Sequence, residues 1–485
     1  MLNQIPNTYI KVLSLFLFLS GPIVKCDPSS FFYSGYVDYT YISRLSDQSI
    51  INIPYRMASL NIENQAGDLL LNGNFVLEYH LREDAFFLES SNPQDFVLDM
   101  RELYTTYTAT NFEFRVGKQI HSWGNVDENS PVDNASALDY YYMFFGGIDR
   151  KMATLSVGMD YFIGNLKINT VFSPLHSTNR IPLGDDDFPV RLPVYPDASE
   201  IFPISGNPFE GGIYGTYSTS FGDISASYFS GYDRTFNLTG VNVYGHGSDI
   251  SFPYVDIVFG YRKTNVLGLG GLLLSDWMTL RWDFGYFSTQ DLNNTIDRPS
   301  SFNPVYYDSL HFTYPLKEEA QYTQSTFQIE TELPFSMNLS AQYFTHNKIS
   351  YNSESLPIDQ EINIPNLELD PEDITPSNFF TPGMGVPLAI LTKKAAFIIL
   401  DRSFLNEQLK ISSTTMIDAA KYSGVSGIAG SLHELRLEYA IREDLQSLLG
   451  ITTVEGSNDH PDKENYPFNR MEDFSHIRLE LKYFF

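Results

Sequence analysis

The chain has few of the features that mark soluble enzymes. Its nine histidines show no metal-binding spacing, and the patterns H-E-x-x-H, G-x-S-x-G and the P-loop are all missing. These absences argue against metalloprotease, serine-hydrolase and nucleotide-hydrolysing chemistry. We therefore expect a protein that is not an enzyme and that has no resident cofactor.

Long hydrophobic runs are also lacking, because no stretch approaches 18 continuous apolar residues after the N-terminal segment. Helical membrane spans are therefore excluded, since each needs about 20 such residues. If the protein lives in a membrane, only a closed β-barrel satisfies every backbone N–H and C=O group inside lipid. The mean hydropathy of -0.18 agrees with strands in which every second residue faces water.

Positive charge is scarce, with 31 Lys and Arg against 59 Asp and Glu, a net charge of -28. This balance excludes a general nucleic-acid-binding protein, which must neutralise phosphates. Much of the acid lies in segments that we expect to be loops, notably Asp185–Asp187, Asp359–Asp373 and Asp459–Asp473. These loops are interpreted either as a solvated rim or as sites where divalent cations bridge the protein to anionic surface lipid.

The first 26 residues have the layout of a secretory signal peptide. Lys11 precedes the apolar stretch Val12–Leu19, which is followed by Ser20, Gly21 and Pro22. Cleavage after Cys26 would remove the only cysteine, as suits an oxidising periplasm. A lipid anchor on Cys26 is less favoured, because Lys25 occupies the place of a small residue. We expect a signal peptide at residues 1–26 and a single barrel domain at residues 27–485.

The last ten residues, His476–Phe485, alternate without a break between apolar and polar side chains. This pattern predicts a strand with one apolar face and one polar face. Its aromatic end resembles the C-terminal assembly signal of bacterial outer-membrane barrels, which implies the barrel-assembly machinery as a partner through Phe485. The 32 Tyr and 37 Phe, against 3 Trp, fit the aromatic girdles of such barrels.

Similar alternation recurs along the whole chain, and we expect about 18 strands, with 16 as the alternative. The predicted strands lie near residues 31–42, 52–63, 69–82, 96–108, 112–121, 153–162, 166–172, 213–220, 224–232, 266–274, 278–287, 323–332, 337–345, 396–404, 409–418, 432–440, 445–454 and 476–485. Tight turns alternate with long polar segments, notably 122–151, 174–210, 234–253, 289–320 and 347–393. This order predicts an all-β, antiparallel up-and-down barrel with short periplasmic turns and long extracellular loops.

The densest motif block runs from Arg101-Glu-Leu-Tyr104 through Phe114-Arg-Val-Gly-Lys-Gln119 to Trp123-Gly124, Asp127, Pro131 and Asp133. Here the sequence resembles uncharacterised families of the outer-membrane porin superfamily, related to alginate-export and phosphate-selective porins. In these families a strand carrying R-x-G-[KR]-Q leads into a W-G-x-x-D loop. Basic clusters suited to phosphate are not apparent, which departs from the phosphate-selective pattern.

The same block suggests where a pore would narrow. By alternation Arg115 and Gln119 point into the lumen, and Trp123, Asp127 and Asp133 belong to a loop that could constrict it. We expect Arg115 to hold that loop through Asp127 or Asp133, although these residues could instead only cap and pack it. Further candidates for the pore lining are Arg281, Asp283, Glu434, Arg436 and Glu438, whose alternative role is in structural charge ladders.

Together these features predict a porin-like channel that gives small polar solutes passive passage across the outer membrane of a double-membraned bacterium. Its expected partners are outer-membrane lipid, lipopolysaccharide and the solutes, and a homo-oligomer is left open. One alternative is a carrier or exporter for a larger or apolar molecule. Another is a hydrolase at the barrel rim, with His346, His433 or His476 as the base.

Overall fold

The computed structural model describes residues 30–80, 96–182, 185, 187–190, 196, 201–204, 208–292, 295–354 and 380–485. The predicted signal peptide and the acidic segment Asp359–Asp373 lie outside these residues. The described chain forms an 18-stranded sheet, a three-stranded sheet and a two-stranded sheet. None of its described helices is long and apolar enough to cross a membrane.

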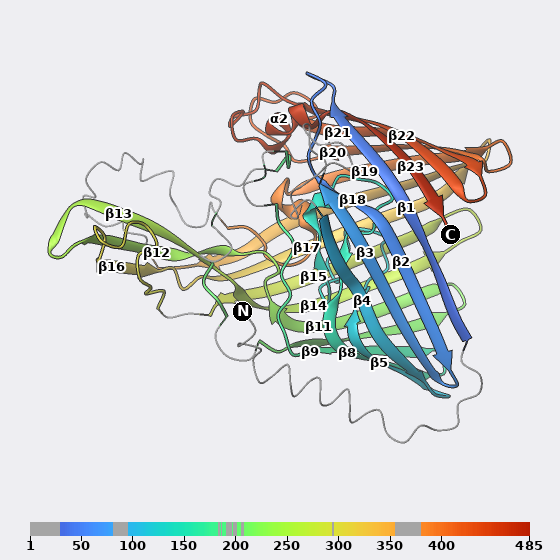
Figure 1. Ribbon diagram of the computed structural model, residues 1–485, viewed down its shortest axis with the longest axis horizontal. Coiled ribbons are helices and arrows are strands. Elements are labelled where there is room, and N and C mark those ends of the chain that lie inside the picture. Colours follow the sequence, from blue (N-terminus) through green and yellow to red (C-terminus); the bar gives the residue numbers. More distant parts are fainter. Residues whose placement is uncertain are drawn as a thin grey trace.

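The 18-stranded sheet is a closed antiparallel barrel (Figure 1). Its strands are β1 (Ser30–Arg44), β2 (Pro54–Ala66), β3 (Leu69–His80), β4 (Phe96–Thr108), β5 (Phe112–Gln119), β8 (Thr154–Ile163), β9 (Leu166–Ser173), β10 (Glu210–Thr219), β11 (Gly222–Tyr232), β14 (Arg262–Leu274), β15 (Thr279–Asp291), β17 (Glu319–Leu333), β18 (Met337–Asn352), β19 (Lys394–Phe404), β20 (Leu409–Asp418), β21 (Gly430–Arg442), β22 (Leu445–Gly456) and β23 (His476–Phe484). Strand β23 pairs with β1, with Glu480 opposite Thr40, and this pairing closes the barrel. The prediction of 18 strands is confirmed, and each predicted strand overlaps one barrel strand.

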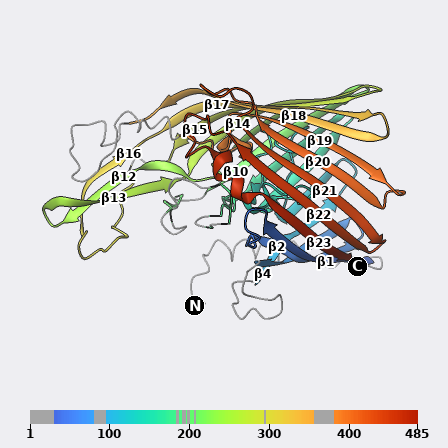
Figure 2. The same ribbon diagram turned by 90° about the horizontal axis from the view of Figure 1, so that it is seen from above.

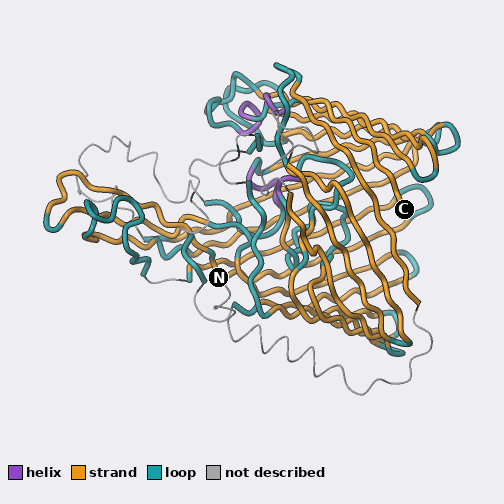
Figure 3. Tube along the Cα trace, viewed as in Figure 1, coloured by secondary structure: helices purple, strands orange, loops and turns teal. Residues whose placement is uncertain are grey.

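Short turns and long connections alternate around the barrel, as the sequence predicted. The short turns, such as those at residues 164–165 and 443–444, lie at one end, together with Phe485 (Figure 3). The long connections gather at the opposite end. We call these the short-turn end and the long-loop end.

The two faces of the barrel wall differ in polarity. On β23 the outward Leu479 and Leu481 are 46% and 47% exposed, whereas the inward Arg478 and Glu480 are buried. Other exposed apolar side chains on barrel strands are Leu69, Leu71, Leu103, Phe114, Phe172, Ile213, Ile224, Leu267, Leu269, Phe327, Ile329, Ile398, Leu435 and Ile451. An apolar surface of this extent is what lipid or a partner protein covers.

The structure corrects the prediction that 234–253 and 289–320 are polar loops. They contain all of β12 (Asn237–His246), the start of β13 (Asp249–Gly260) and all of β16 (Ser309–Pro315), which pair in the order β13-β12-β16. We call this sheet the arm; it projects from the long-loop end (Figure 2). The prediction failed because register shifts within β12 break the period-two pattern that reveals a strand.

Smaller elements lie within the long connections. They are β6 (Ala137–Leu138), β7 (Lys151–Met152), the 3-10 helices η2 (Tyr140–Tyr142), η5 (Pro387–Ile390) and η6 (Glu472–Phe474), and the short helix α2 (Pro467–Arg470). The largest apolar cluster among the described residues is built mainly from these connections and includes Phe144, Leu388, Phe468 and Met471. The long connections therefore pack against one another instead of leaving the long-loop end open.

Candidate functional site

The connection between β5 and β8 folds into the barrel lumen. We call residues 120–150 the inserted segment. Its first turn hydrogen-bonds to β15, and farther on Gly146 lies against Arg436 and Glu434 of β21. Because β15 and β21 are separated by several strands of the barrel, the segment crosses the lumen.

Asp283 of β15 is the main anchor of the inserted segment. Its carboxylate accepts hydrogen bonds from the backbone N–H of Asn125 (2.8 Å) and Val126 (3.0 Å), from the Asn125 side-chain amide (2.9 Å) and from the Ser130 hydroxyl (2.8 Å). The side chain is almost fully buried. The carboxylate of this one residue of the wall therefore accepts hydrogen bonds from the donors of a whole turn of the segment.

Asp127 is held next to this anchor. Gln328 of β17 donates a side-chain hydrogen bond to the Asp127 carboxylate (2.6 Å) and accepts one from the Asp127 backbone N–H (3.0 Å). Arg281 of β15 lies 3.6 Å from the same carboxylate and donates to the carbonyl of Asn125 (3.1 Å). The structure thus brings together the predicted candidates Asp127, Arg281 and Asp283.

Trp123 fixes the start of the segment against the wall at β9 and β10. Its indole N–H donates to Asn169 of β9 (2.7 Å), and its ring stacks on Tyr214 at 5.8 Å. Its backbone N–H donates to Asp133 (3.0 Å), whose carboxylate also pairs with Lys151. Gln119 is buried and donates to the carbonyl of Ser156 (3.1 Å), so it supports the wall.

Two glycines of the motif block are explained by close contacts. Gly117 has a φ of +141°, and a Cβ there would lie 2.3 Å from the carbonyl oxygen of Leu103. Gly124 has a φ of +105°, and its Cβ would meet Ser130 at 2.2 Å and Asp283 at 2.7 Å. Both positions need glycine for the backbone conformation and for space.

The prediction that Arg115 holds the inserted segment is wrong. Arg115 points inward, but it pairs with Asp160 of β8 at 3.3 Å, and Lys167 shares that carboxylate at 3.1 Å. Arg115 faces Gly158 in the strand register, so Asp160 is its diagonal neighbour. Arg115 is a ladder residue of the wall, and the bonds that hold Asp127 and Asp133 come from other residues.

Glu434, Arg436 and Glu438 line the lumen on β21, as alternation predicted. Arg436 pairs with Glu438 at 2.7 Å, which is the ladder that the sequence left as the alternative. A Cβ on Gly146 would lie 2.5 Å from Arg436 and 2.8 Å from Glu434. This ladder therefore also meets the inserted segment at its far side.

The lumen contains two cavities beside the inserted segment. Chamber A, of about 250 Å³, lies between β1, Ile53–Arg56, Arg101, Arg478–Lys482 of β23 and the Phe145–Asp149 part of the segment. Chamber B, of about 280 Å³, is lined by Asp127–Ser130, Asp133, Gly147–Lys151, Gly385 and Pro387. Both are lined by Gly147, Ile148 and Asp149, so the two chambers meet at this stretch.

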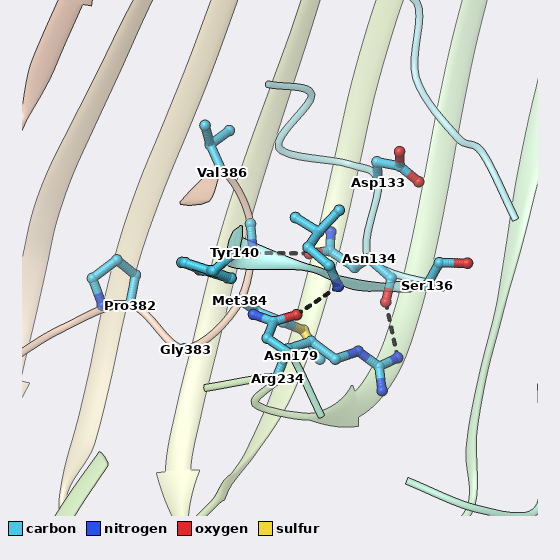
Figure 4. A pocket seen from close by; sticks show the side chains of 12 residues that line it. Asp133, Asn134, Ser136, Tyr140, Asn179, Arg234, Pro382, Gly383, Met384 and Val386 are labelled. Atoms are coloured by element: carbon cyan, nitrogen blue, oxygen red, sulfur yellow. Dashed lines mark hydrogen bonds between the residues drawn. The ribbon is translucent and has the colours of Figure 1, made fainter. Parts of the chain in front are cut away.

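A third cavity marks only a seam between loops (Figure 4). There Arg234 donates to the carbonyl of Asn134 (3.0 Å), and Asn134 accepts from the backbone N–H of Gly385 (3.0 Å). Its volume of about 10 Å³ is room for roughly one water molecule. The hydrogen bond between Asn134 and Gly385 therefore ties the inserted segment to the connection between β18 and β19. The cavity itself offers no space for a solute.

Sequence reasoning missed a group of basic side chains. Arg56, Arg101, Arg478 and Lys482 all line chamber A, although they come from β2, β4 and β23. Only the pairing of β1 with β23 brings the two ends of the chain together. Arg56 and Arg101 lie at register shifts that interrupt the alternation of their strands, so no local pattern predicts the cluster, and the statement that no basic cluster is apparent needs correction.

Arg180 links chamber A to the next connection. It pairs with Asp139 of the inserted segment at 3.0 Å and with Glu78 of β3 at 2.6 Å, and Glu78 accepts a hydrogen bond from the Tyr142 hydroxyl (3.2 Å). Burial raises the pKa of Asp139 to about 6, although Arg180 opposes the shift. This network fixes the Tyr142 ring at the wall of chamber A.

His121 leads to a prediction about pH. Burial, assisted by Arg115, lowers the pKa of His121 to about 3 in the folded protein, whereas an unfolded histidine titrates near 6.5. The stability that depends on neutral His121 is therefore present above pH 6.5 and is lost as the pH falls. We expect the free energy of unfolding to fall less steeply between pH 6.5 and 4 in His121→Asn than in the wild type. The difference should be up to about 1.4 kcal/mol per pH unit.

The measurement is denaturant unfolding of the lipid-embedded barrel at several pH values, followed by tryptophan fluorescence. His246→Asn is the matched control, because His246 is exposed on the arm. Identical pH slopes for wild type and His121→Asn would contradict the prediction.

The remaining site predictions concern metal ions and the histidines that could act as a base. Among the described residues, no three His, Cys, Asp or Glu side chains are grouped to hold a metal ion. His433 contacts Ser431 and Thr415, and His476 lies 2.6 Å from the Phe474 carbonyl. In the part of the chain that the structure describes, neither of them, nor His346, pairs with a carboxylate, so none of the three predicted bases has the carboxylate partner of a catalytic triad there. Divalent cations at the acidic loops stay a prediction.

Neither a protein-family model nor a curated protein matches this chain. Solved structures of similar fold include Pseudomonas aeruginosa OccK2 (OpdF) in complex with glucuronate, at 9% identity and a TM-score of 0.47, with 94% of this chain and 98% of that chain covered. Acinetobacter baumannii OccAB4 has 12% identity and a TM-score of 0.46, with coverages of 95% and 99%. A BenF-like porin from Pseudomonas fluorescens has 9% identity and a TM-score of 0.45, with coverages of 95% and 98%. At these identities the likeness concerns the barrel fold alone.

Proposed function

We propose that the protein is an outer-membrane channel that gives small polar solutes passive passage. The observation that carries this proposal is a closed 18-stranded barrel that is apolar outside and polar inside. Barrels of 16 to 18 strands enclose an aqueous lumen, and the exposed outer side chains need lipid around them. The inserted segment with chambers A and B then forms the narrow part of the path.

The test is planar-bilayer recording of the refolded protein, together with liposome swelling in uncharged sugars of increasing size. We expect discrete conductance steps and a swelling rate that falls steeply with sugar size, because the inserted segment narrows the lumen. Absence of both conductance and swelling would remove the channel function.

The predicted partners belong to this proposal. The outward apolar side chains would contact outer-membrane lipid, and the long connections would face lipopolysaccharide outside the cell. The barrel-assembly machinery would recognise the terminal strand β23 together with Phe485, which follows it and exchanges two backbone hydrogen bonds with Gly35 (3.0 Å each). A homo-oligomer, bridging divalent cations and kinship with alginate-export and phosphate-selective porins stay predictions.

A carrier for a larger or apolar molecule is the second candidate. It is favoured by the apolar cluster of long connections around Phe144, Leu388 and Phe468 at the long-loop end. The swelling test separates the two functions, because a carrier whose mouth is sealed by this cluster would admit none of the sugars.

A further inference from the structure

Arg402 of β19 points outward from the barrel wall. It lies opposite Ile411 of β20, and Leu400, two positions earlier, lies opposite Leu339 of β18. Ile398, two positions earlier again, is 40% exposed on the outer face. Because the side chains of a strand alternate between its two faces, Arg402 shares the outer face with these apolar residues. A guanidinium is costly inside hydrocarbon, so this one needs a polar partner at the membrane surface.

The outward row of β19 has a cation at each end. It begins with Lys394 near the long-loop end, continues with Ala396, Ile398 and Leu400, and ends with Arg402 near the short-turn end. From Lys394 to Arg402 the strand rises by about 26 Å, at about 3.3 Å per residue. A tilt of about 40° reduces this rise to about 20 Å across the membrane, and the apolar band of such barrels is about 25 Å tall. Arg402 therefore lies where the headgroups of the leaflet at the short-turn end begin.

The guanidinium of Arg402 has no acceptor among the described residues. Its Nε–H is buried and makes no hydrogen bond, and no described carboxylate forms an ion pair with it. The contact that it makes is with the ring of Phe404, whose centre lies 4.6 Å from the guanidinium carbon. Arg442 at the same end of the barrel differs, because it pairs with Asp444 at 3.0 Å. The acceptor that Arg402 lacks within the described chain can come from the lipid around it.

A phosphodiester has the properties that this position requires. Its two free oxygens can accept hydrogen bonds from the planar fork of one guanidinium, and its single negative charge balances one cation. The apolar side chains of Leu339, Leu400 and Ile411 adjoin Arg402 on the same outer face. Acyl chains attached to the phosphodiester would therefore find an apolar surface directly beside it.

We propose that Arg402 binds the phosphodiester of a glycerophospholipid in the leaflet at the short-turn end, and that an acyl chain of this lipid rests on Leu339, Leu400 and Ile411. The inference rests on the membrane placement of the barrel in the proposed function, but not on conduction. The site lies on the outside of the wall, so it is separate from the path of the solute.

The test is native mass spectrometry of the refolded full-length barrel, titrated in detergent with dioleoylphosphatidylglycerol. We expect saturable retention of the lipid by wild type and binding that is at least about 10-fold weaker in Arg402→Gln, because charge-assisted hydrogen bonds are lost. Dioleoylglycerol, which has the same acyl chains without the phosphate, should not be retained measurably. Arg442→Gln is the matched control, since Asp444 already neutralises Arg442, and it should bind the lipid like wild type.

Other outcomes overturn the site. Equal affinity of wild type and Arg402→Gln, with heat-modifiable mobility showing that both are folded, would remove Arg402. Equal retention of dioleoylglycerol by wild type would remove the role of the phosphate, and this comparison does not depend on the variant. Binding of glycerol 3-phosphate as tight as that of the lipid would replace the lipid by a soluble phosphate ester. Conductance is recorded on the same preparations, so that a conducting barrel without lipid retention refutes only the site, and a lipid-binding barrel without conductance refutes only the channel.

Discussion

Asp283→Ala should increase the single-channel conductance, or make it noisy, while the barrel still assembles. In the wild type this carboxylate accepts four hydrogen bonds from Asn125, Val126 and Ser130. Hydrogen bonds to a charged group contribute about 1.5–3 kcal/mol each, and the variant loses all four. We therefore expect at least about 3 kcal/mol less stabilisation of the inserted segment against the wall.

The barrel itself should survive this change, because Asp283 lies opposite Gly270 and Thr326 in a register maintained by backbone pairing along both neighbours of β15. The measurement is single-channel recording in a planar bilayer, with heat-modifiable gel mobility as the check of folding. A conductance and noise spectrum equal to those of the wild type would show that the segment is fixed without this anchor.

Two further variants make the comparison specific. Asp276→Ala removes a carboxylate from the exposed turn of the same β-hairpin and should conduct like wild type. Arg115→Ala should also conduct like wild type, because Arg115 bonds to Asp160 and not to the inserted segment. If Arg115→Ala freed the segment and Asp283→Ala did not, Arg115 and not Asp283 would be the residue that holds the inserted segment.

The barrel could be predicted from the sequence because its wall separates lipid-facing from lumen-facing side chains at every second residue. On β23 this rule gave the correct inward and outward faces over its whole length. The arm could not be predicted in the same way. Its strand β12 is buried on both faces and carries register shifts, so the alternation disappears.

The candidate site was predictable in its members but not in its contacts. Asp127, Arg281 and Asp283 were each identified from alternation or motif, yet their meeting depends on how the inserted segment crosses the lumen. Arg115 was assigned the wrong partner because Asp160, two register positions away on the next strand, is nearer than any loop carboxylate. Arg56 was overlooked because a register shift between Arg56 and Ala58 turns it into the lumen against the alternation of the rest of its strand.

The root of the arm should be the part of the protein most sensitive to a single substitution. Arg262 at the start of β14 is fully buried, donates to Asp233 at 2.6 Å and to the carbonyl of Thr381 at 2.7 Å, and pairs with Glu318. Its guanidinium lies 5.0 Å from the centre of the Phe380 ring. These contacts join the connections on both sides of the arm to the rim of the barrel.

Arg262→Ala should therefore loosen the arm, because two buried carboxylates lose their counter-charge. Removal of one partner from a buried ion pair costs about 3–5 kcal/mol, which corresponds to opening that is roughly a hundred to a few thousand times more frequent. Limited proteolysis should cleave the arm, between residues 234 and 318, faster by a similar factor, while heat-modifiable mobility shows an intact barrel. Arg442→Ala is the matched control and should leave the cleavage rate unchanged.

The cause can be separated from simple loss of packing. Adding Asp233→Asn and Glu318→Gln to an Arg262→Met background removes the uncompensated charges and keeps most of the volume. Since the cost of the single substitution comes mainly from unpaired buried carboxylates, the triple variant should resist the protease better than Arg262→Ala. Equal cleavage of wild type and Arg262→Ala would mean that the arm is held by its own sheet pairing and the loops around it, and not by this charge network.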